Sequence, residues 1–253
     1  MKQLINIFIY LSTIVMIAQN DSIFKQGNEL YNKGKFLEAI NTFESILDNN
    51  MHSAELYFNL ANSYYKLNQI ASSIYYYEKA LQLSPKDMDI INNLGFAQNM
   101  TIDSIETLPE IGFSKFMNST ANKFSFDIWA KVSVVFVVFF MMLFLSYYFS
   151  YSTAKKRMAF IGSFLLLGCA LMTLLFAFHK YAIDKNDNPA IVFAQESDVK
   201  VDPNLRSESS FQLHEGTKVQ VLERYNDTWI KIKIANGKNG WILTKDIKLL
   251  NDI

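Results

Sequence analysis

Cysteine and histidine are scarce in this chain of 253 residues, and their scarcity limits the chemistry that it can perform. A single cysteine, Cys169, excludes an intrachain disulfide and any zinc site built on several cysteines. The three histidines, His52, His179 and His214, fall in separate segments, and no His-x-x-x-His or Cys-x-x-Cys spacing occurs. We therefore expect neither a bound metal nor a cofactor.

The usual signatures of catalysis are also missing from the sequence. A nucleophile needs a neighbouring base, but Cys169 lies inside a long apolar run. No glycine-rich loop of the kind that holds phosphate groups is present. We therefore expect that the protein is not an enzyme.

The chain has no excess of charge of either sign. Lysine and arginine together number 24, as do aspartate and glutamate, so nothing in the charge balance indicates binding to nucleic acid. Hydrophobic residues nevertheless make up 50% of the chain and charged residues 19%. Such averages are typical of chains whose segments differ sharply in character, and three long apolar runs divide this one.

The first apolar run begins the sequence and resembles an export signal. Met1 and Lys2 provide a short basic start, and residues 4–18 are almost entirely apolar. Ala18 suits the position before a cleavage site, whereas Met16 does not suit the position two residues earlier. We predict a signal peptide over residues 1–19, with an uncleaved N-terminal anchor as the alternative. In both cases the chain after Asn20 lies outside the cytoplasm.

Two further runs are long enough to cross a membrane. Residues 132–154 and 158–178 carry no charge, and a spanning helix needs roughly 20 apolar residues. Trp129 at one end and a tyrosine group at the other resemble the aromatic belts of membrane proteins. That group consists of Tyr147, Tyr148 and Tyr151. We predict transmembrane helices over residues 128–150 and 158–179.

The short connection between these helices fixes the expected orientation. Lys155, Lys156 and Arg157 form the densest basic cluster of the chain, and such clusters stay in the cytoplasm. We therefore predict a cytoplasmic loop over residues 151–157. The segments before and after the two helices then share the opposite side, the periplasm of a bacterial inner membrane, in agreement with the export signal.

A period of 34 residues runs through residues 20–106. Small residues recur at Gly27, Ala61 and Gly95, and Phe43 recurs as Tyr77. The segment resembles a tetratricopeptide-repeat domain of two repeats and a capping helix from about Met88. The residues of the second repeat that carry the resemblance are Tyr57, Leu60, Ala61, Tyr64, Tyr77, Ala80 and Pro85, whereas Ser73 departs from the usual alanine. The small residues should let neighbouring helices approach closely, with the aromatic residues filling the space between them.

Solenoids of this kind bind extended segments along a concave face. The expected groove residues follow the repeat and are Phe24, Asn28, Tyr31, Phe58, Asn62, Tyr65, Phe96 and Asn99. The asparagines could hydrogen-bond the backbone of a docked peptide, and the aromatic residues could supply apolar contact. Alternatively, the aromatic residues only pack the repeats and the asparagines are solvated. The segment leans acidic, which favours a mildly basic partner.

A linker over residues 107–127 precedes the first membrane helix. Pro109 is expected to end the capping helix. Phe113, Phe116, Met117 and Phe124 follow near helical spacing, with polar residues between them. The segment is either an amphipathic helix on the outer face of the membrane or a tether whose apolar residues pack under the repeats.

From residue 190 to about 250 the apolar pattern changes to alternation, which indicates a small β-barrel. Asn236-Gly237 marks a tight turn between two strands. The module resembles the bacterial type of Src-homology-3 domain through Val199-Lys-Val201, Gly216, Val219-Gln-Val221, Trp229 and Gly240-Trp241. The usual Asn-Val-Arg of the first motif is missing, which argues against a ligand site built on that arginine. The resemblance implies binding of cell-wall peptides or protein segments, with Tyr225, Trp229 and Trp241 either forming an aromatic groove or filling the core.

The order of these parts resembles the BatE proteins of the aerotolerance operons of Bacteroidetes. The fold class is therefore a multidomain membrane protein with an all-α repeat solenoid, two transmembrane helices and a small all-β barrel. The resemblance implies a scaffold in an envelope complex with von Willebrand factor A proteins and a MoxR-type ATPase, active in oxidative or envelope stress. Membrane lipid is a further expected partner. The alternative is a sensor whose barrel binds peptidoglycan and whose repeats are only a spacer.

Overall fold

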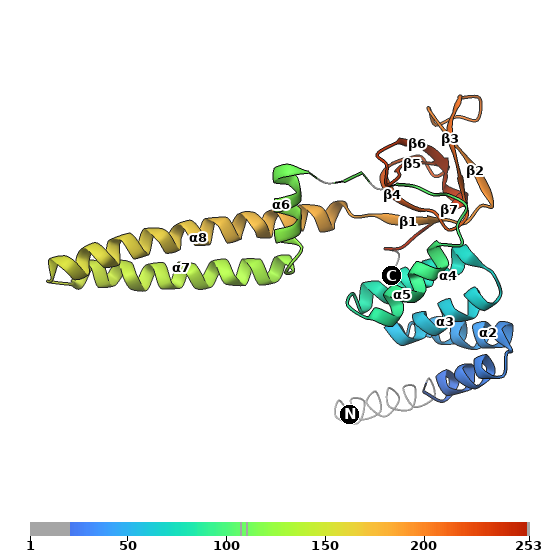
Figure 1. Cartoon of the computed structure of the whole chain (residues 1–253), viewed down its shortest axis with the longest axis horizontal. Coiled ribbons are helices and arrows are strands. Elements are labelled where there is room, and N and C mark those ends of the chain that lie inside the picture. The colour runs from blue at the N-terminus through green and yellow to red at the C-terminus, as the bar shows by residue number, and fades with distance from the viewer. Residues whose placement is uncertain (1–20, 107, 110, 252–253) are drawn as a thin grey trace, which may run out of the picture. The chain divides into compact units, whose positions relative to one another are not determined.

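The computed structural model describes residues 21–106, 108–109 and 111–251. The predicted signal peptide over residues 1–19 therefore lies outside the described residues. Within the described residues the chain forms two compact units: residues 21–106 together with 188–251, and residues 108–109 together with 111–187 (Figure 1). The first unit contains helices and strands, and the second contains helices.

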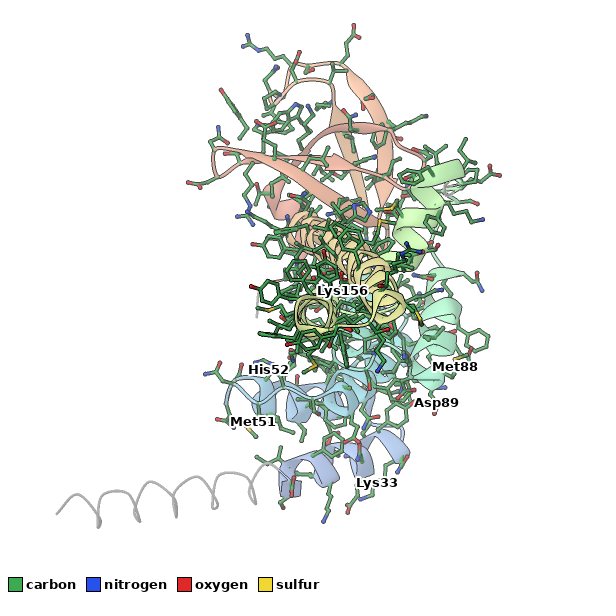
Figure 2. All side chains as sticks on the ribbon, turned by 90° about the vertical axis from the view of Figure 1, so that its left-hand side faces the viewer. Lys33, Met51, His52, Met88, Asp89 and Lys156 are labelled. Carbon is green, nitrogen blue, oxygen red and sulfur yellow. The ribbon has the colours of Figure 1, made fainter. Side chains whose placement is uncertain are left out.

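The N-terminal part of the first unit is a stack of helix pairs. After the helical residues 21–32 come four helices: α2 (Phe36–Leu47), α3 (Ala54–Lys66), α4 (Ile70–Leu83) and α5 (Met88–Gln98). Ser53 begins α3 by accepting a hydrogen bond from the backbone of Leu56, and Asp87 does the same for α5 through Asp89 and Ile90. Met51 and His52 lie in the connection before α3, and Met88 and Asp89 at the start of α5 (Figure 2).

Small residues permit close contact between the helices of a pair. A side-chain carbon on Gly27 would overlap the ring of Phe43, which is fully buried. Ala61 and Tyr77 are buried at the equivalent positions one repeat later. Gly95 differs, because a side-chain carbon there would meet no atom within 4 Å. The predicted small–aromatic pairing therefore holds in both complete repeats, whereas the space beside Gly95 is open.

The C-terminal part of the first unit is an antiparallel β-domain. Its seven strands are β1 (Pro189–Val192), β2 (Glu196–Lys200), β3 (Ser209–His214), β4 (Lys218–Tyr225), β5 (Trp229–Lys233), β6 (Asn239–Leu243) and β7 (Ile247–Leu249). They form one sheet in the order β3-β2-β6-β5-β4-β1-β7. Alternating residues such as Ile230 and Ile232 are buried in its core. At the predicted turn Gly237 has a φ of 87° and donates its N–H to the carbonyl of Ile234.

The second unit consists of α6 (Gly112–Ala121), α7 (Phe126–Phe149) and α8 (Thr153–Asn186). Among the described residues, α7 and α8 are the two helices that are long and apolar enough to span a membrane. They pack side by side as a hairpin (Figure 1). The hydroxyl of Ser133 in α7 donates to the carbonyl of Ala170 in α8 at 2.9 Å, so the one buried polar side chain of α7 is satisfied within the hairpin.

Helix α8 is longer at both ends than the apolar run that predicted it. The expected loop 151–157 is mostly helical, because α8 already begins at Thr153 and includes Lys155, Lys156 and Arg157. Lys156 thus lies in the first turns of the helix (Figure 2). At the other end α8 continues past the apolar run to Asn186, where Lys180 and Asp184 form an ion pair one turn apart.

Candidate protein-binding site

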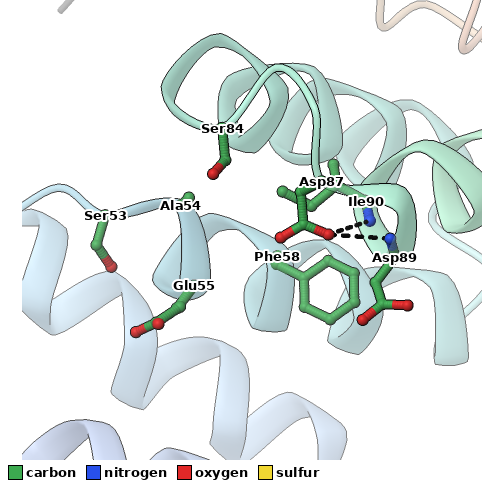
Figure 3. A pocket seen from close by; sticks show the side chains of 8 residues that line it. All are labelled: Ser53, Ala54, Glu55, Phe58, Ser84, Asp87, Asp89 and Ile90. Carbon is green, nitrogen blue, oxygen red and sulfur yellow. Dashed lines mark hydrogen bonds between the residues drawn. The ribbon is translucent and has the colours of Figure 1, made fainter.

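The first helices of the repeats border a cavity of about 450 Å³ (Figure 3). It lies between the start of α3 and the start of α5, with Phe58 beside it. The residues around it are Ser53, Ala54, Glu55, Phe58, Ser84, Asp87, Asp89 and Ile90. The carboxylate of Asp87 is held by the backbone N–H groups of Asp89 and Ile90 at 2.9 and 3.4 Å. This cavity therefore has an aromatic side and an acidic rim.

A second cavity, of about 230 Å³, repeats the same arrangement. Its residues are Asp21, Phe24, Ile46, Met51, His52, Ser53, Glu55 and Leu56. Phe24 precedes Phe58 by 34 positions, and Asp21 precedes Glu55 by the same number. Ser53 and Glu55 border both cavities. The two cavities are thus consecutive positions along one surface of the solenoid, which we call the repeat groove.

The two phenylalanines of the repeat groove are packing residues and groove residues at once. Phe24 contacts the ring of Phe43 with a centroid distance of 5.8 Å, and Phe58 contacts Tyr77 at 5.9 Å. Both phenylalanines are only partly buried. Their rings therefore rest on the core of the repeats and leave part of their surface to the cavities.

The asparagines predicted to bind a peptide, Asn28 and Asn62, form hydrogen bonds within the repeats. Asn28 accepts a hydrogen bond from the side chain of Asn59 at 2.9 Å. The side-chain oxygen of Asn62 accepts the hydroxyl of Tyr77, and burial raises the pKa of this tyrosine, so that it stays a donor. Each amide is thereby held in one orientation within the solenoid.

The remaining predicted groove residues lie outside the two cavities. Tyr31 packs edge-on against Phe36 with a centroid distance of 5.3 Å, and Tyr65 packs against the core of the repeats. Phe96, which lies in α5, and Asn99, which directly follows α5, are both exposed. The structure therefore brings Phe24 and Phe58 to the groove, and it adds Ser53, Glu55 and Asp89, which the sequence analysis did not select.

The three aromatic residues of the β-domain have different environments. Trp229 and Trp241 are buried, whereas Tyr225 is 53% exposed. Tyr225 lies edge-on to Trp241 with ring centroids 5.9 Å apart. The Nζ of Lys231 lies 5.6 Å from the centre of the Trp241 ring. An aromatic surface with one exposed ring is present, while both tryptophans belong mainly to the interior.

The repeats and the β-domain meet at an interface that the sequence analysis did not predict. Asp103, in the segment after α5, accepts hydrogen bonds from the backbone of His214 at 2.7 Å and from the hydroxyl of Thr217 at 2.6 Å. The His214 ring also lies 2.7 Å from its carboxylate. Burial alone would raise the pKa of Asp103, but these hydrogen bonds and the nearby His214 lower it below its usual value of 3.8.

Further contacts join α4 to the β-domain. Glu78 and Lys218 form an ion pair at 2.7 Å, and the Nζ of Lys248 lies 4.4 Å from the centre of the Tyr75 ring. Ile191 and Leu250 are fully buried in the same apolar cluster as the helices of the second repeat. The two domains therefore share a core, and no single pattern in the sequence could have indicated which surfaces meet.

Comparisons with known families agree with this architecture. Residues 54–87 match the tetratricopeptide repeat, and residues 198–248 match the bacterial SH3 domain. The chain contains both modules. Its N-terminal part is thus a helical domain with a tetratricopeptide repeat, a module that generally mediates contacts between proteins, and its C-terminal part is an antiparallel β-domain of the SH3 type.

Whole-chain similarity is much weaker. No curated protein matches the chain. Among solved structures, a NlpC/P60 family protein from Bacillus cereus shares 15% sequence identity with this chain, with a TM-score of 0.22. The match covers 28% of this chain and 23% of the Bacillus cereus protein. The chain therefore spans less than a quarter of that protein, and the likeness carries no argument about its activity.

Proposed function

We propose that the protein is a non-enzymatic membrane-anchored scaffold that holds an extended segment of a partner protein in the repeat groove. The observation that carries this proposal is the pair of consecutive cavities, each bordered by a phenylalanine one repeat apart. An extended peptide places side chains at regular intervals, so a surface with regularly spaced apolar sites suits such a ligand. The hydrogen bonds of Asn28 with Asn59 and of Asn62 with Tyr77 tie together the helices on which these phenylalanines rest.

The charge of the groove selects among such segments. Asp21, Glu55 and Asp89 are exposed along its rim, and all three border the cavities. Complementary charge across an interface favours encounter and correct register. The proposed ligand is therefore an extended segment that alternates apolar side chains with lysine or arginine.

The arrangement of the chain supports a membrane anchor inserted into this scaffold. Residues 21–106 and 188–251 pack as one unit with a shared core, which supports a hairpin that leaves and returns on the same side of a membrane. The basic residues Lys155, Lys156 and Arg157 at the far end of the hairpin favour a cytoplasmic position for that end. Repeats and β-domain then lie in the periplasm of a bacterial inner membrane.

The resemblance to BatE proteins gives this scaffold a cellular setting. It implies partners among membrane-anchored von Willebrand factor A proteins and a MoxR-type ATPase system, and a role in aerotolerance or envelope stress. Within the described residues, His52 contacts Tyr57, His179 contacts Asn118 and His214 contacts Asp103. The Asp103–His214 contact joins the repeats to the β-domain, a structural role that agrees with a non-enzymatic scaffold.

The proposal is tested by capture of partners from native membranes with two charge-matched variants. Glu55→Lys/Asp89→Lys reverses the rim of the groove, whereas Glu29→Lys/Glu38→Lys reverses two exposed carboxylates that border neither cavity. We expect the first variant to lose a specific membrane partner after crosslinking and the second to retain it. Equal recovery by both variants would contradict the groove.

A second candidate function is binding of peptidoglycan by the β-domain. The match to the bacterial SH3 domain and the exposed Tyr225 beside Trp241 favour it. The test is sedimentation of the detergent-solubilised chain with purified peptidoglycan. Binding that falls with Tyr225→Ala but not with Leu205→Ala, a change at another exposed apolar residue of this domain, would support the sensor. Absence of sedimentation would exclude it.

A further inference from the structure

Helix α6 leaves the hairpin sideways. Figure 1 shows it crosswise to the long axes of α7 and α8. Its C-terminal end is held by polar contacts: Asn118 lies 2.8 Å from the His179 ring, and Asn122 accepts a hydrogen bond from Lys180 at 3.0 Å. The fully buried Ala121 also accepts the indole N–H of Trp129 through its carbonyl. These contacts fix the direction of α6 relative to the hairpin.

The attachment point coincides with the end of the apolar surface of the hairpin. His179 and Lys180 directly follow Phe178, the last residue of the uncharged run in α8. Trp129 lies in the first turns of α7, a position typical of an interfacial aromatic residue. A helix fixed at this level and crosswise to the hairpin would lie along the surface of a membrane.

The part of α6 that projects from the hairpin exposes large apolar side chains. Phe113 is 76% exposed and Phe116 is 56% exposed, and their ring centroids are 6.4 Å apart. Spacing of three residues places them on one side of the helix. Lys115 and Ser119, which are also exposed, are four residues apart and share a different side. The helix is therefore amphipathic in its free portion.

We propose that α6 is an interfacial helix that inserts Phe113 and Phe116 into the outer leaflet of the bilayer, at the boundary between headgroups and acyl chains. The proposal rests on the membrane anchor described above. Lipid is the occupant because the exposed phenylalanines continue the apolar exterior of α7 and α8, where residues such as Val137 and Leu171 are exposed. No acidic residue lies within α6, and Lys115 and Lys123 suit anionic headgroups.

Such a helix would set the depth of the hairpin and its rotation about the membrane normal. The polar contacts of Asn118 and Asn122 link it directly to α8. An in-plane helix resists movement of the hairpin along the membrane normal, because displacement would expose its phenylalanines to water or bury the side chain of Lys115. Helix α6 thus positions the anchor in the membrane, and this role does not depend on which partner the repeats bind.

The test uses spin labels on the full chain in vesicles of phosphatidylethanolamine and phosphatidylglycerol. In a Cys169→Ser background, single cysteines replace Phe113, Ser119, Val137 or Asn204. Collision with oxygen reports lipid, and collision with a water-soluble nickel chelate reports water. We expect the label at position 113 to be several-fold more accessible to oxygen than to the chelate, and to lie at a shallower depth in the bilayer than the label at position 137. The labels at positions 119 and 204 should be more accessible to the chelate than to oxygen.

The label at Val137 separates failure of this inference from failure of the anchor. If the label at position 137 is in lipid and the label at position 113 collides with the chelate as often as the label at position 204, the proposal of an interfacial helix is wrong, while the membrane anchor is supported. The same holds if 113 is shielded from both agents, since that result indicates contact with protein. If 137 itself meets the chelate, the anchor fails and the inference with it. Adding Phe116→Ser should reduce the oxygen accessibility at 113 several-fold and leave 137 unchanged; no change at 113 would overturn the role of Phe116.

Discussion

The carboxylate of Asp103 binds His214 through two donors, the backbone N–H at 2.7 Å and the imidazole ring at 2.7 Å. The two residues are 111 positions apart and belong to different domains. The next turn of the β-domain reinforces the contact: Gly216 has a φ of 86°, and a side-chain carbon there would lie 2.8 Å from Thr101. The repeats and the β-domain are therefore fitted to each other by both charge and shape.

Replacing Asp103 by asparagine should weaken this interface. The variant removes the charge that accepts three hydrogen bonds and leaves the donors of His214 and Thr217 imperfectly paired. We expect a loss of about 1–3 kcal/mol in the free energy of unfolding, measured on the full chain in detergent by chemical denaturation. Asp227→Asn, at an exposed residue of the β-domain, is the control and should cost little. Equal effects of both variants would show that the Asp103 contacts contribute nothing.

The contribution of Asp103 should depend on pH in a defined window. Its pKa in the folded protein is lower than the usual 3.8, so the unfolded chain binds a proton first as the pH falls. The stabilisation is then fully present above pH 3.8 and is lost as the pH falls through the folded-state pKa. The difference in the free energy of unfolding between the unaltered chain and Asp103→Asn should shrink as the pH falls below 3.8. A difference that grows as the pH falls would reverse the sign of this linkage.

Gly27 and Gly95 occupy equivalent positions in the first repeat and in the capping helix, two periods apart, but should respond oppositely to alanine. A side-chain carbon at Gly27 overlaps the ring of Phe43, whereas one at Gly95 meets no atom within 4 Å. Overpacking at the first site should cost about 1–3 kcal/mol, while the second should gain up to about 1 kcal/mol from higher helix propensity. The midpoints of thermal unfolding should therefore move in opposite directions. A parallel shift in both variants would show that the spacing between helices is not set by Gly27.

Ser73→Ala should stabilise the second repeat. The Oγ of Ser73 is buried and makes no hydrogen bond of full geometry. It lies near the hydroxyl of Tyr77, which already donates its proton to Asn62, so this weak contact offsets only part of the desolvation cost of the Ser73 hydroxyl. Ser72→Ala, at the neighbouring and only partly buried position of α4, gains the same helix propensity and serves as the control. We expect Ser73→Ala to raise the unfolding midpoint further than Ser72→Ala, by an amount equivalent to about 1 kcal/mol. A smaller rise at Ser73 would mean that its hydroxyl is satisfied.

The elements of the fold could be predicted from the sequence because each one carries a local period. The spacing of 34 residues places Gly27 against Phe43, and alternation places Ile230 and Ile232 in the core of the β-domain. The groove was predicted only in part. Phe24 and Phe58 border its cavities as expected, whereas Glu55 and Asp89 follow the same period but were not selected, since charged residues at helix starts are common. An asparagine pattern alone also could not reveal that Tyr77 already occupies the amide oxygen of Asn62.

The order of residues suffices to assign the kind of each segment: repeat helices, two long apolar helices and an alternating β-module. Burial of one face of an element, or of all its faces, produces a regular pattern of apolar residues within that element. In contrast, the contacts of Asp103 with His214, of Lys248 with Tyr75 and of α6 with His179 follow only from the three-dimensional structure. These contacts depend on the relative placement of surfaces that are far apart in the chain, and each involves one or two side chains, which are too few to produce a period.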